Sequence, residues 1–270
     1  MCIRDSNSPY HFPRGAEAGT LIHAVFEHLD FRSTSQQQLQ DYAEKQLRAH
    51  GVDTQWIPAL CQLVRNTLDT PLEMSGLSGG FSLSALDTKD RLDELGFHFP
   101  VQSLQAEQLV NLLREAEVLG AEDGLLFDRL DGYMTGFIDL TFRHDNRWYI
   151  ADYKSNHLGY EPEDYNQNVL TEAMKHNRYD LQYLIYAVAL RRYLRNRLPD
   201  FNSERDFGGV FYLFVRGMPG QTDPKKTDPK KTENYNPTGV YVARPPEKLL
   251  DALDQLLNGD RLSGKSNGNA

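Results

Sequence analysis

The stretch that decides the fold is Gly136–Lys154, GFIDLTFRHDNRWYIADYK. Its two halves, Gly136–Arg143 and Arg147–Lys154, are rich in β-branched and aromatic residues, which is the composition of β-strands. Between them the pair Asp145-Asn146 is typical of a tight two-residue turn. The stretch therefore predicts a β-hairpin that is closed by this turn.

The predicted turn also sets which residues of the two strands face each other. Pairing that runs outward from the turn brings Asp139 directly opposite Asp152, with Cβ atoms about 4.5–5.5 Å apart. Lys154 lies two residues beyond Asp152, and because side chains alternate along a strand it shares the same face. The sequence therefore predicts two carboxylates and one ammonium group close together on one face of the hairpin.

Two carboxylates at that distance need a reason, because like charges opposed across strands destabilise a sheet and shift each other's pKa. A hard divalent cation removes the repulsion, and Mg²⁺ typically binds one or two carboxylates together with phosphate and water. Beside such a cation, Lys154 could orient or help to deprotonate an attacking water, or offset charge on a phosphate. The pattern favours metal-dependent phosphodiester chemistry.

The alternative is a surface hairpin on which Lys154 forms ordinary ion pairs with both aspartates. Taken alone, an acid-acid-lysine set on two strands is more often of this kind. The neighbouring residues favour a buried hairpin instead, in which carboxylates need partners. These neighbours make both faces apolar: Phe137, Ile138, Leu140, Phe142, Tyr149, Ile150 and Ala151.

Helices and further strands are predicted around this hairpin from the spacing of apolar residues. The helices cover Thr20–Leu29, Gln36–Arg48, Ile57–Leu68, Tyr179–Arg197 and Pro246–Leu257, with a mixed helix over Leu104–Leu119. The strands cover Arg91–Pro100 and Gly208–Arg216, and a polar stretch covers Ser155–Asn168.

The chain has 270 residues and a formal net charge of −9, with 40% hydrophobic and 25% charged residues. This acidic balance argues against a protein that coats nucleic acid over its whole surface. The two cysteines, Cys2 and Cys61, cannot form a disulfide framework or a four-cysteine metal site. No apolar run approaches the length of a membrane span, so a cytoplasmic location without a membrane partner is expected.

Two segments stand apart from the predicted elements. Thr222–Lys226 and Thr227–Lys231 both read TDPKK, and prolines and lysines at this density cannot build a core. A solvated insertion is the favoured interpretation, with contact to DNA as the alternative. Gly259–Ser266 (GDRLSGKS) matches the phosphate-loop pattern, but a predicted helix precedes it and only Asn267–Ala270 follow. No ATP binding is therefore expected from this part of the chain.

Several short motifs occur in an order that resembles the RecB-type nuclease family of the restriction-endonuclease-like, PD-(D/E)xK superfamily. Asp139 followed by Asp152-Tyr153-Lys154 matches the D…(D/E)xK core. The other matches are GxxxHxxxE at Gly19, His23 and Glu27, an isolated acid at Glu94, GxxD at Gly136–Asp139, and QxxxY at Gln182 and Tyr186. Each motif is weak alone, but together they extend from about Gly15 to about Gly259 and carry the resemblance.

The resemblance implies an α/β fold with a mixed central sheet flanked by helices, and Mg²⁺-dependent hydrolysis of phosphodiester bonds in DNA. It implies metal ligation by His23, Asp139, Asp152 and the backbone carbonyl of Tyr153, with Lys154 as the catalytic lysine. Mn²⁺ is a plausible substitute in vitro, because imidazole suits transition metals better than Mg²⁺. Similar nucleases with an iron–sulfur cluster need four cysteines, so no such cluster is expected.

The resemblance also implies domain bounds and partners. Residues 1–14 would precede the nuclease domain, 15–259 would form it with a mobile basic loop at 219–238, and 260–270 would be a disordered tail. The motifs are closest to the nuclease domain at the carboxyl end of a helicase–nuclease subunit. An upstream helicase domain, RecC- and RecD-like subunits, DNA in single- and double-stranded form, and a RecA-like recombinase are therefore the expected partners, in break repair and recombination.

Some motif residues have two interpretations each. His23 in an apolar helix is ordinarily a satisfied core histidine, and only the surrounding motif favours a metal ligand. Glu27, one turn later, either orients His23 or forms a local ion pair. Gln182, one turn from Tyr186, is expected to position DNA or a metal-bound water. Basic residues around that helix either contact phosphate or form a solvated face: Lys175, Arg178, Arg191, Arg192 and Arg195.

Two rival functions remain open on the sequence. One is a docking module that binds other helicase subunits or a recombinase, although a docking module has no need of the intact acid-acid-lysine set. The other, weaker, is a different phosphodiesterase or a ribonuclease on the same fold.

Overall fold

The computed structural model describes residues 8–32, 35–74, 81–118, 124, 127–221 and 237–260. The TDPKK repeats and most of GDRLSGKS lie outside these residues. The chain forms two compact units, each assembled from separate stretches of sequence. The first contains residues 1–95, 138–173 and 208–243, and the second contains residues 96–137, 174–207 and 244–270.

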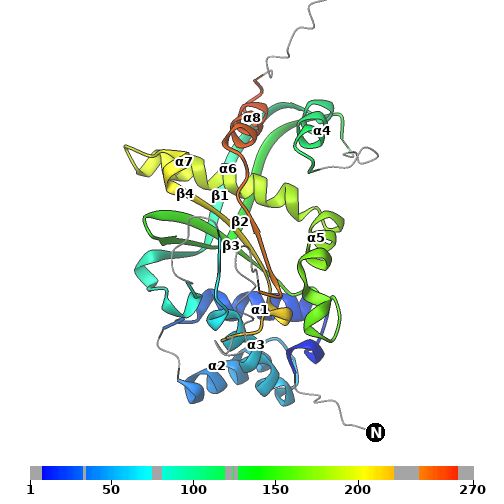
Figure 1. Ribbon diagram of the computed structural model, residues 1–270, viewed down its shortest axis with the longest axis vertical. Helices are drawn as coiled ribbons and strands as arrows, with labels where there is room; N and C mark the ends of the chain where they lie inside the picture. Colours follow the sequence, from blue (N-terminus) through cyan, green and yellow to red (C-terminus); the bar gives the residue numbers. More distant parts are fainter. Residues whose placement is uncertain are drawn as a thin grey trace, which may run out of the picture. The chain divides into compact units, whose positions relative to one another are not determined.

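The strands form one five-stranded sheet in the order β1-β2-β3-β4-β5 (Figure 1). Their bounds are β1 (Arg91–Gln105), β2 (Arg129–His144), β3 (Arg147–Lys154), β4 (Phe207–Phe214) and β5 (Val240–Ala243). The β2–β3 and β4–β5 pairs are antiparallel. The mixed sheet with its flanking helices confirms the predicted α/β fold class.

The predicted hairpin is confirmed together with its register. β2 pairs with β3 as far as Leu140 opposite Ala151, which is the alignment that a two-residue loop dictates. Asp145 and Asn146 have φ angles of 47° and 60°. This left-handed conformation at both central residues belongs to the type I′ turn that matches the twist of a hairpin, and Asp and Asn tolerate it.

Three helices of the first unit bury their apolar faces in one core, and the contacts α1–α2 and α2–α3 link them (Figure 1, blue to cyan). They are α1 (Ala16–His28), α2 (Gln36–Ala49) and α3 (Ile57–Asp69). The same core includes Leu140 and Phe142 of β2 and Phe211 of β4. The hairpin is therefore part of the hydrophobic core, which fixes the position of the charged residues at its end.

In the second unit, α8 (Glu247–Leu257) packs against α4 (Ala106–Glu115) and α6 (Tyr179–Arg197). The short α7 (Ser203–Asp206) follows α6, and α5 (Gln167–His176) begins in the first unit and ends in the second. None of the described helices is both long enough and apolar enough to cross a membrane.

Differences from the sequence predictions lie mainly at the ends of elements. α1 begins at Ala16 rather than Thr20, because Gly15, with a φ of 99°, starts the helix. α5 and β5 were not predicted, and α5 begins within the stretch read as polar. The expected burial of Phe137 is wrong: this side chain is 63% exposed, because only one face of β2 is covered there.

Candidate active site

The charged face of the hairpin is buried in the first unit. The side chains of Asp152 and Lys154 are only 2% and 10% exposed, and that of Asp139 is 19% exposed. Lys154 Nζ lies 2.6 Å from Asp152 Oδ1. The two side chains therefore share one face, as alternation along the strand requires, and they form an ion pair that water hardly reaches.

Asp139 is held by contacts from two elements. The backbone N–H of Tyr153 on β3 donates a hydrogen bond to Asp139 Oδ2 at 2.9 Å. His23 Nδ1, carried by α1, lies 3.2 Å from the same oxygen. The Tyr153 ring stacks on Phe26 of α1 with centroids 4.3 Å apart. This stacking packs α1 against β3 and so delivers the imidazole to the aspartate.

The surroundings of the hairpin shift the pKa values of Asp152 and His23. Burial first, and then the charge of Asp139, raise the pKa of Asp152 to about 7, although Lys154 opposes both effects. Burial alone would lower the pKa of His23, but its hydrogen bond to Asp139 and the charge of that aspartate outweigh burial and raise it. One ammonium group therefore does not balance the two carboxylates.

The side chains that would hold a metal stand in two pairs. Asp139 contacts His23, and Asp152 contacts Lys154. In the described part of the chain, no three His, Cys, Asp or Glu side chains are gathered closely enough to hold a metal ion as they stand. The donor set nevertheless fits a hard cation, because the oxygens of two carboxylates, Asp139 and Asp152, suit Mg²⁺.

The sequence matches the PD-(D/E)XK nuclease superfamily over residues 2–265. The chain belongs to this superfamily. The predicted acid-acid-lysine set, Asp139, Asp152 and Lys154, lies on the buried hairpin of this superfamily member.

Relatives within the superfamily confirm the RecB-type resemblance. The chain is 39% identical over 254 residues to the RecBCD enzyme subunit RecB of Escherichia coli (strain K12), covering 93% of the chain and 20% of that subunit. It is 35% identical over 242 residues to RecB of Haemophilus influenzae, covering 90% and 18%. For RecB of Mycobacterium tuberculosis (strain CDC 1551 / Oshkosh) the identity is 37% over 278 residues, covering 93% and 24%. The chain therefore corresponds to about a fifth of these relatives' length.

The predicted motif of Gly19, His23 and Glu27 lies on α1. A Cβ atom at Gly19 would come 3.1 Å from Ser155 Oγ, so the glycine lets α1 approach the segment that follows Lys154. Glu27 Oε1 lies 3.5 Å from His28 Nε2, which favours the local ion pair over an orienting contact with His23. Glu94 is exposed on β1 with a φ of 47° and stands outside the contacts described above.

The predicted motif of Gln182 and Tyr186 lies on α6 in the second unit. Gln182 Nε2 donates to the hydroxyl of Tyr186 at 2.8 Å, so these two residues of α6 are brought to each other. The Tyr186 ring meets Phe97 edge to face at 5.9 Å. Lys175 and Arg178 are exposed, and Arg178 precedes α6 in a left-handed conformation.

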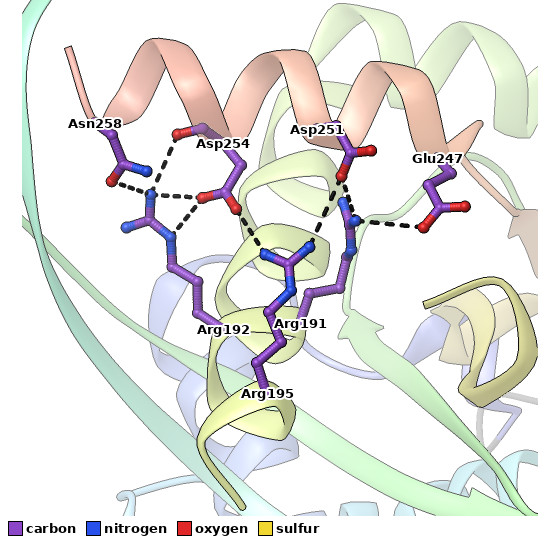
Figure 2. A network of polar contacts seen from close by, with 7 residues as sticks. All are labelled: Arg191, Arg192, Arg195, Glu247, Asp251, Asp254 and Asn258. Atoms are coloured by element: carbon purple, nitrogen blue, oxygen red, sulfur yellow. Dashed lines mark hydrogen bonds and ion pairs between the residues drawn. The ribbon is translucent and has the colours of Figure 1, made fainter. Parts of the chain in front are cut away.

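The arginines along α6 neither form a merely solvated face nor lack protein partners that a phosphate would have to replace. Figure 2 shows their guanidinium groups pointing at the carboxylates of α8. Arg192 and Arg195 meet Asp254 at 2.6 Å and 2.9 Å, and Arg191 meets Asp251 at 2.5 Å. These side chains join two helices, which explains them without a phosphate ligand.

Arg216 is a buried cation that the sequence reading missed as a supporting residue. It is 1% exposed, and its guanidinium donates to the carbonyl oxygens of Ser155 at 2.9 Å, Phe12 at 2.7 Å and Pro13 at 2.6 Å. It thereby ties the segment after Lys154 to the chain before α1. The available signal was an arginine that directly follows the apolar run Gly208–Val215.

Proposed function

We propose that the chain is a Mg²⁺-dependent deoxyribonuclease domain that hydrolyses phosphodiester bonds, of the exodeoxyribonuclease V type. The observation that carries this proposal is the buried Asp152–Lys154 pair, packed on the same hairpin as Asp139 in a chain of the PD-(D/E)XK superfamily. A purely structural pair would not need a second carboxylate whose charge raises the pKa of the first.

Each polar residue of the hairpin has a task in this reaction. Asp139 and Asp152 would hold the metal together with His23 and the carbonyl of Tyr153. Mg²⁺, when bound, polarises the phosphate and favours ionisation of water. Asp152 fixes the ammonium of Lys154 at 2.6 Å, so that the lysine donates to a phosphate oxygen and offsets the charge that develops there. Tyr153 orients Asp139 through its backbone N–H.

The wider setting follows from the relatives. Because the chain spans about a fifth of RecB, we propose that a helicase domain precedes it in a longer subunit. RecC- and RecD-like subunits, a RecA-like recombinase, and single- and double-stranded DNA are its proposed partners, in cytoplasmic repair and recombination of double-strand breaks.

Cleavage of single-stranded DNA in Mg²⁺ tests the proposal with Asp139→Ala, Asp152→Ala and Lys154→Ala. We expect losses of about 100-fold or more from each, as for removal of a group that stabilises developing charge. Lys89→Ala, at an exposed lysine of the same unit, is the control and should cleave at the normal rate. A normal rate in any of the first three variants would remove that residue from the mechanism.

A docking module is the second candidate, and one observation favours it: among the described residues the predicted metal ligands are not gathered around one point. Such a module would bind partner subunits without cleaving DNA. DNA binding with no cleavage in Mg²⁺ or Mn²⁺, by a chain that melts cooperatively, would support docking over hydrolysis.

A further inference from the structure

Two large aromatic side chains lie open to solvent on β2 in the second unit. Tyr133 is 70% exposed and Phe137 is 63% exposed, the highest values among the described large hydrophobic residues. More exposed and less exposed residues alternate between them. Side chains alternate faces along a strand, so both rings project from the same side of β2.

The opposite face of this strand pair is covered within the unit. Phe97 of β1 meets Tyr186 of α6 at 5.9 Å, and the guanidinium of Arg192 lies 4.4 Å from the ring centre of Phe99. The core of the unit is therefore formed on that side. Tyr133 and Phe137 are not needed for it, and exposed aromatic area of this kind marks a binding surface.

Each exposed ring is supported from one side. The ring of His98 stacks on Tyr133 with centroids 4.6 Å apart and planes 9° from parallel. A Cβ atom at Gly96 would lie 3.3 Å from Phe137 Cε1, so the glycine lets this ring rest close to the backbone of β1. The rings are thus held in place before any ligand binds, which lowers the entropic cost of binding.

Two observations favour a nucleic-acid strand as the occupant. Phe137 precedes Asp139 by two residues of β2, and covalent geometry alone keeps their Cα atoms within about 7 Å. The segments Gly96–Pro100 and Tyr133–Phe137 contain no acidic residue, although the whole chain has a net charge of −9. Between Tyr133 and Phe137 a bound nucleic-acid strand therefore meets no carboxylate of β2, and the nearest ones on this strand, Asp131 and Asp139, lie two residues beyond each ring.

We propose that Tyr133 and Phe137 stack on bases of single-stranded DNA and make the domain prefer single strands to duplex. Stacking on aromatic rings accepts every base, whereas bases in a duplex have their faces covered by their neighbours. The two rings are four residues apart, about 13 Å along the strand, so each takes a different base. This inference rests on the proposed nuclease function, which supplies the nucleic-acid substrate.

Binding measured without cleavage tests the stacking. The 270-residue chain is titrated in EDTA with a fluorescent oligothymidylate, and separately with an abasic strand of the same length. Tyr133→Ala and Phe137→Ala should each weaken binding of oligothymidylate about tenfold and leave binding of the abasic strand unchanged. Tyr133→Phe and Phe137→Tyr, which keep a ring, should bind like the wild type. Leu130→Ala is the control, at a residue of β2 that is 40% exposed but not aromatic.

The outcomes separate this inference from its alternatives. Equal loss of binding to oligothymidylate and to the abasic strand would assign the rings a structural role. No loss of binding to either strand would indicate that this face binds a protein partner instead. Both results would overturn the proposal. Because binding in EDTA requires no hydrolysis, a chain that binds bases through these rings but does not cleave would overturn only the proposed function. Duplex DNA should show no dependence on either ring.

Discussion

The acid–lysine cluster of the first unit and the arginine–carboxylate network of the second treat buried charge differently. In the cluster, Asp152 meets Lys154 at 2.6 Å and Asp139 meets His23 at 3.2 Å, and the pKa of Asp152 is nevertheless raised to about 7. In the network, the arginines of α6 meet an equal number of carboxylates on α8 (Figure 2): Arg191, Arg192 and Arg195 meet Glu247, Asp251 and Asp254.

The difference indicates a functional role for the acid–lysine cluster and a structural, scaffold role for the arginine–carboxylate network. Charges that are matched in number and joined by short contacts hold two helices together, although Nε and Nη1 of Arg191 are buried without a hydrogen-bond partner among the described residues. Where two carboxylates lie close together in a buried place, one raises the pKa of the other, and such shifted pKa values are typical of functional sites. The same residue types therefore have different roles, and the balance of charge decides which.

Removing one carboxylate from each cluster should give the largest contrast. Asp152→Asn is expected to lower DNA cleavage by about 10²–10³-fold, because an amide cannot supply the negative charge that holds the metal. Asp251→Asn makes the same chemical change in the network and should leave the cleavage rate per folded molecule unchanged. Initial rates on single-stranded DNA measure both. Equal losses in the two variants would abolish the distinction between the clusters.

The free energy of unfolding should depend on the arginine–carboxylate network, which the cleavage rate does not. Asp254→Ala removes the acceptor of both Arg192 and Arg195 at a side chain that is only 15% exposed. We expect the free energy of unfolding to fall by about 1–3 kcal/mol, as measured by urea denaturation. Glu44→Ala breaks an exposed pair with Arg48 on α2 and should cost less than about 0.5 kcal/mol. A larger effect at Glu44 would contradict the scaffold role.

The pH dependence of stability should arise in part from the acid–lysine cluster, alongside Asp180, whose pKa is raised to about 6 by burial. Folded Asp152 binds its proton more tightly than the unfolded chain does, so stability without metal falls as the pH rises towards and through about 7. His23, whose pKa is also raised, contributes with the same sign. Melting temperatures in EDTA between about pH 5 and pH 8 should therefore decline. The decline should be shallower in Asp152→Asn, and an identical slope would show that Asp152 does not titrate in this range.

The smallest expected change in the free energy of unfolding is at Glu247, the most weakly paired carboxylate of the network. Glu247 is 44% exposed and lies 3.7 Å from Arg191, a distance at which solvent screens most of the attraction. Glu247→Gln should change the free energy of unfolding by less than about 0.5 kcal/mol. Chemical denaturation of this variant and of Asp251→Asn would rank the contributions of Glu247 and Asp251 to the free energy of unfolding. A cost at Glu247 that exceeds the cost at Asp251 would mean that the contacts are ranked wrongly.

Local chemistry explains which predictions from sequence were right. The hairpin, its turn and its register follow from neighbouring residues, since Asp145 and Asn146 tolerate left-handed φ angles and a two-residue loop permits one alignment. The placement of Asp152 and Lys154 on one face follows from the same alternation. Phe137 shows the limit of this reasoning, because alternation alone does not say which face of a strand is covered.

Contacts between distant segments do not follow from residue spacing, and only the resemblance to a family grouped His23 with Asp139. His23 meets Asp139 only because Phe26 packs on Tyr153, and Arg216 ties Ser155 to the chain before α1. The partners of Arg191 lie far along the chain on α8, and nothing in the α6 sequence names them.

The hairpin, its charged face and the resemblance to RecB-type nucleases could be inferred from the amino-acid sequence, because each depends on residues whose spacing is set by the backbone. Which charges are balanced became apparent only from the folded chain. That balance depends on burial and on partners brought together by packing, and these are properties of the folded chain rather than of any short segment.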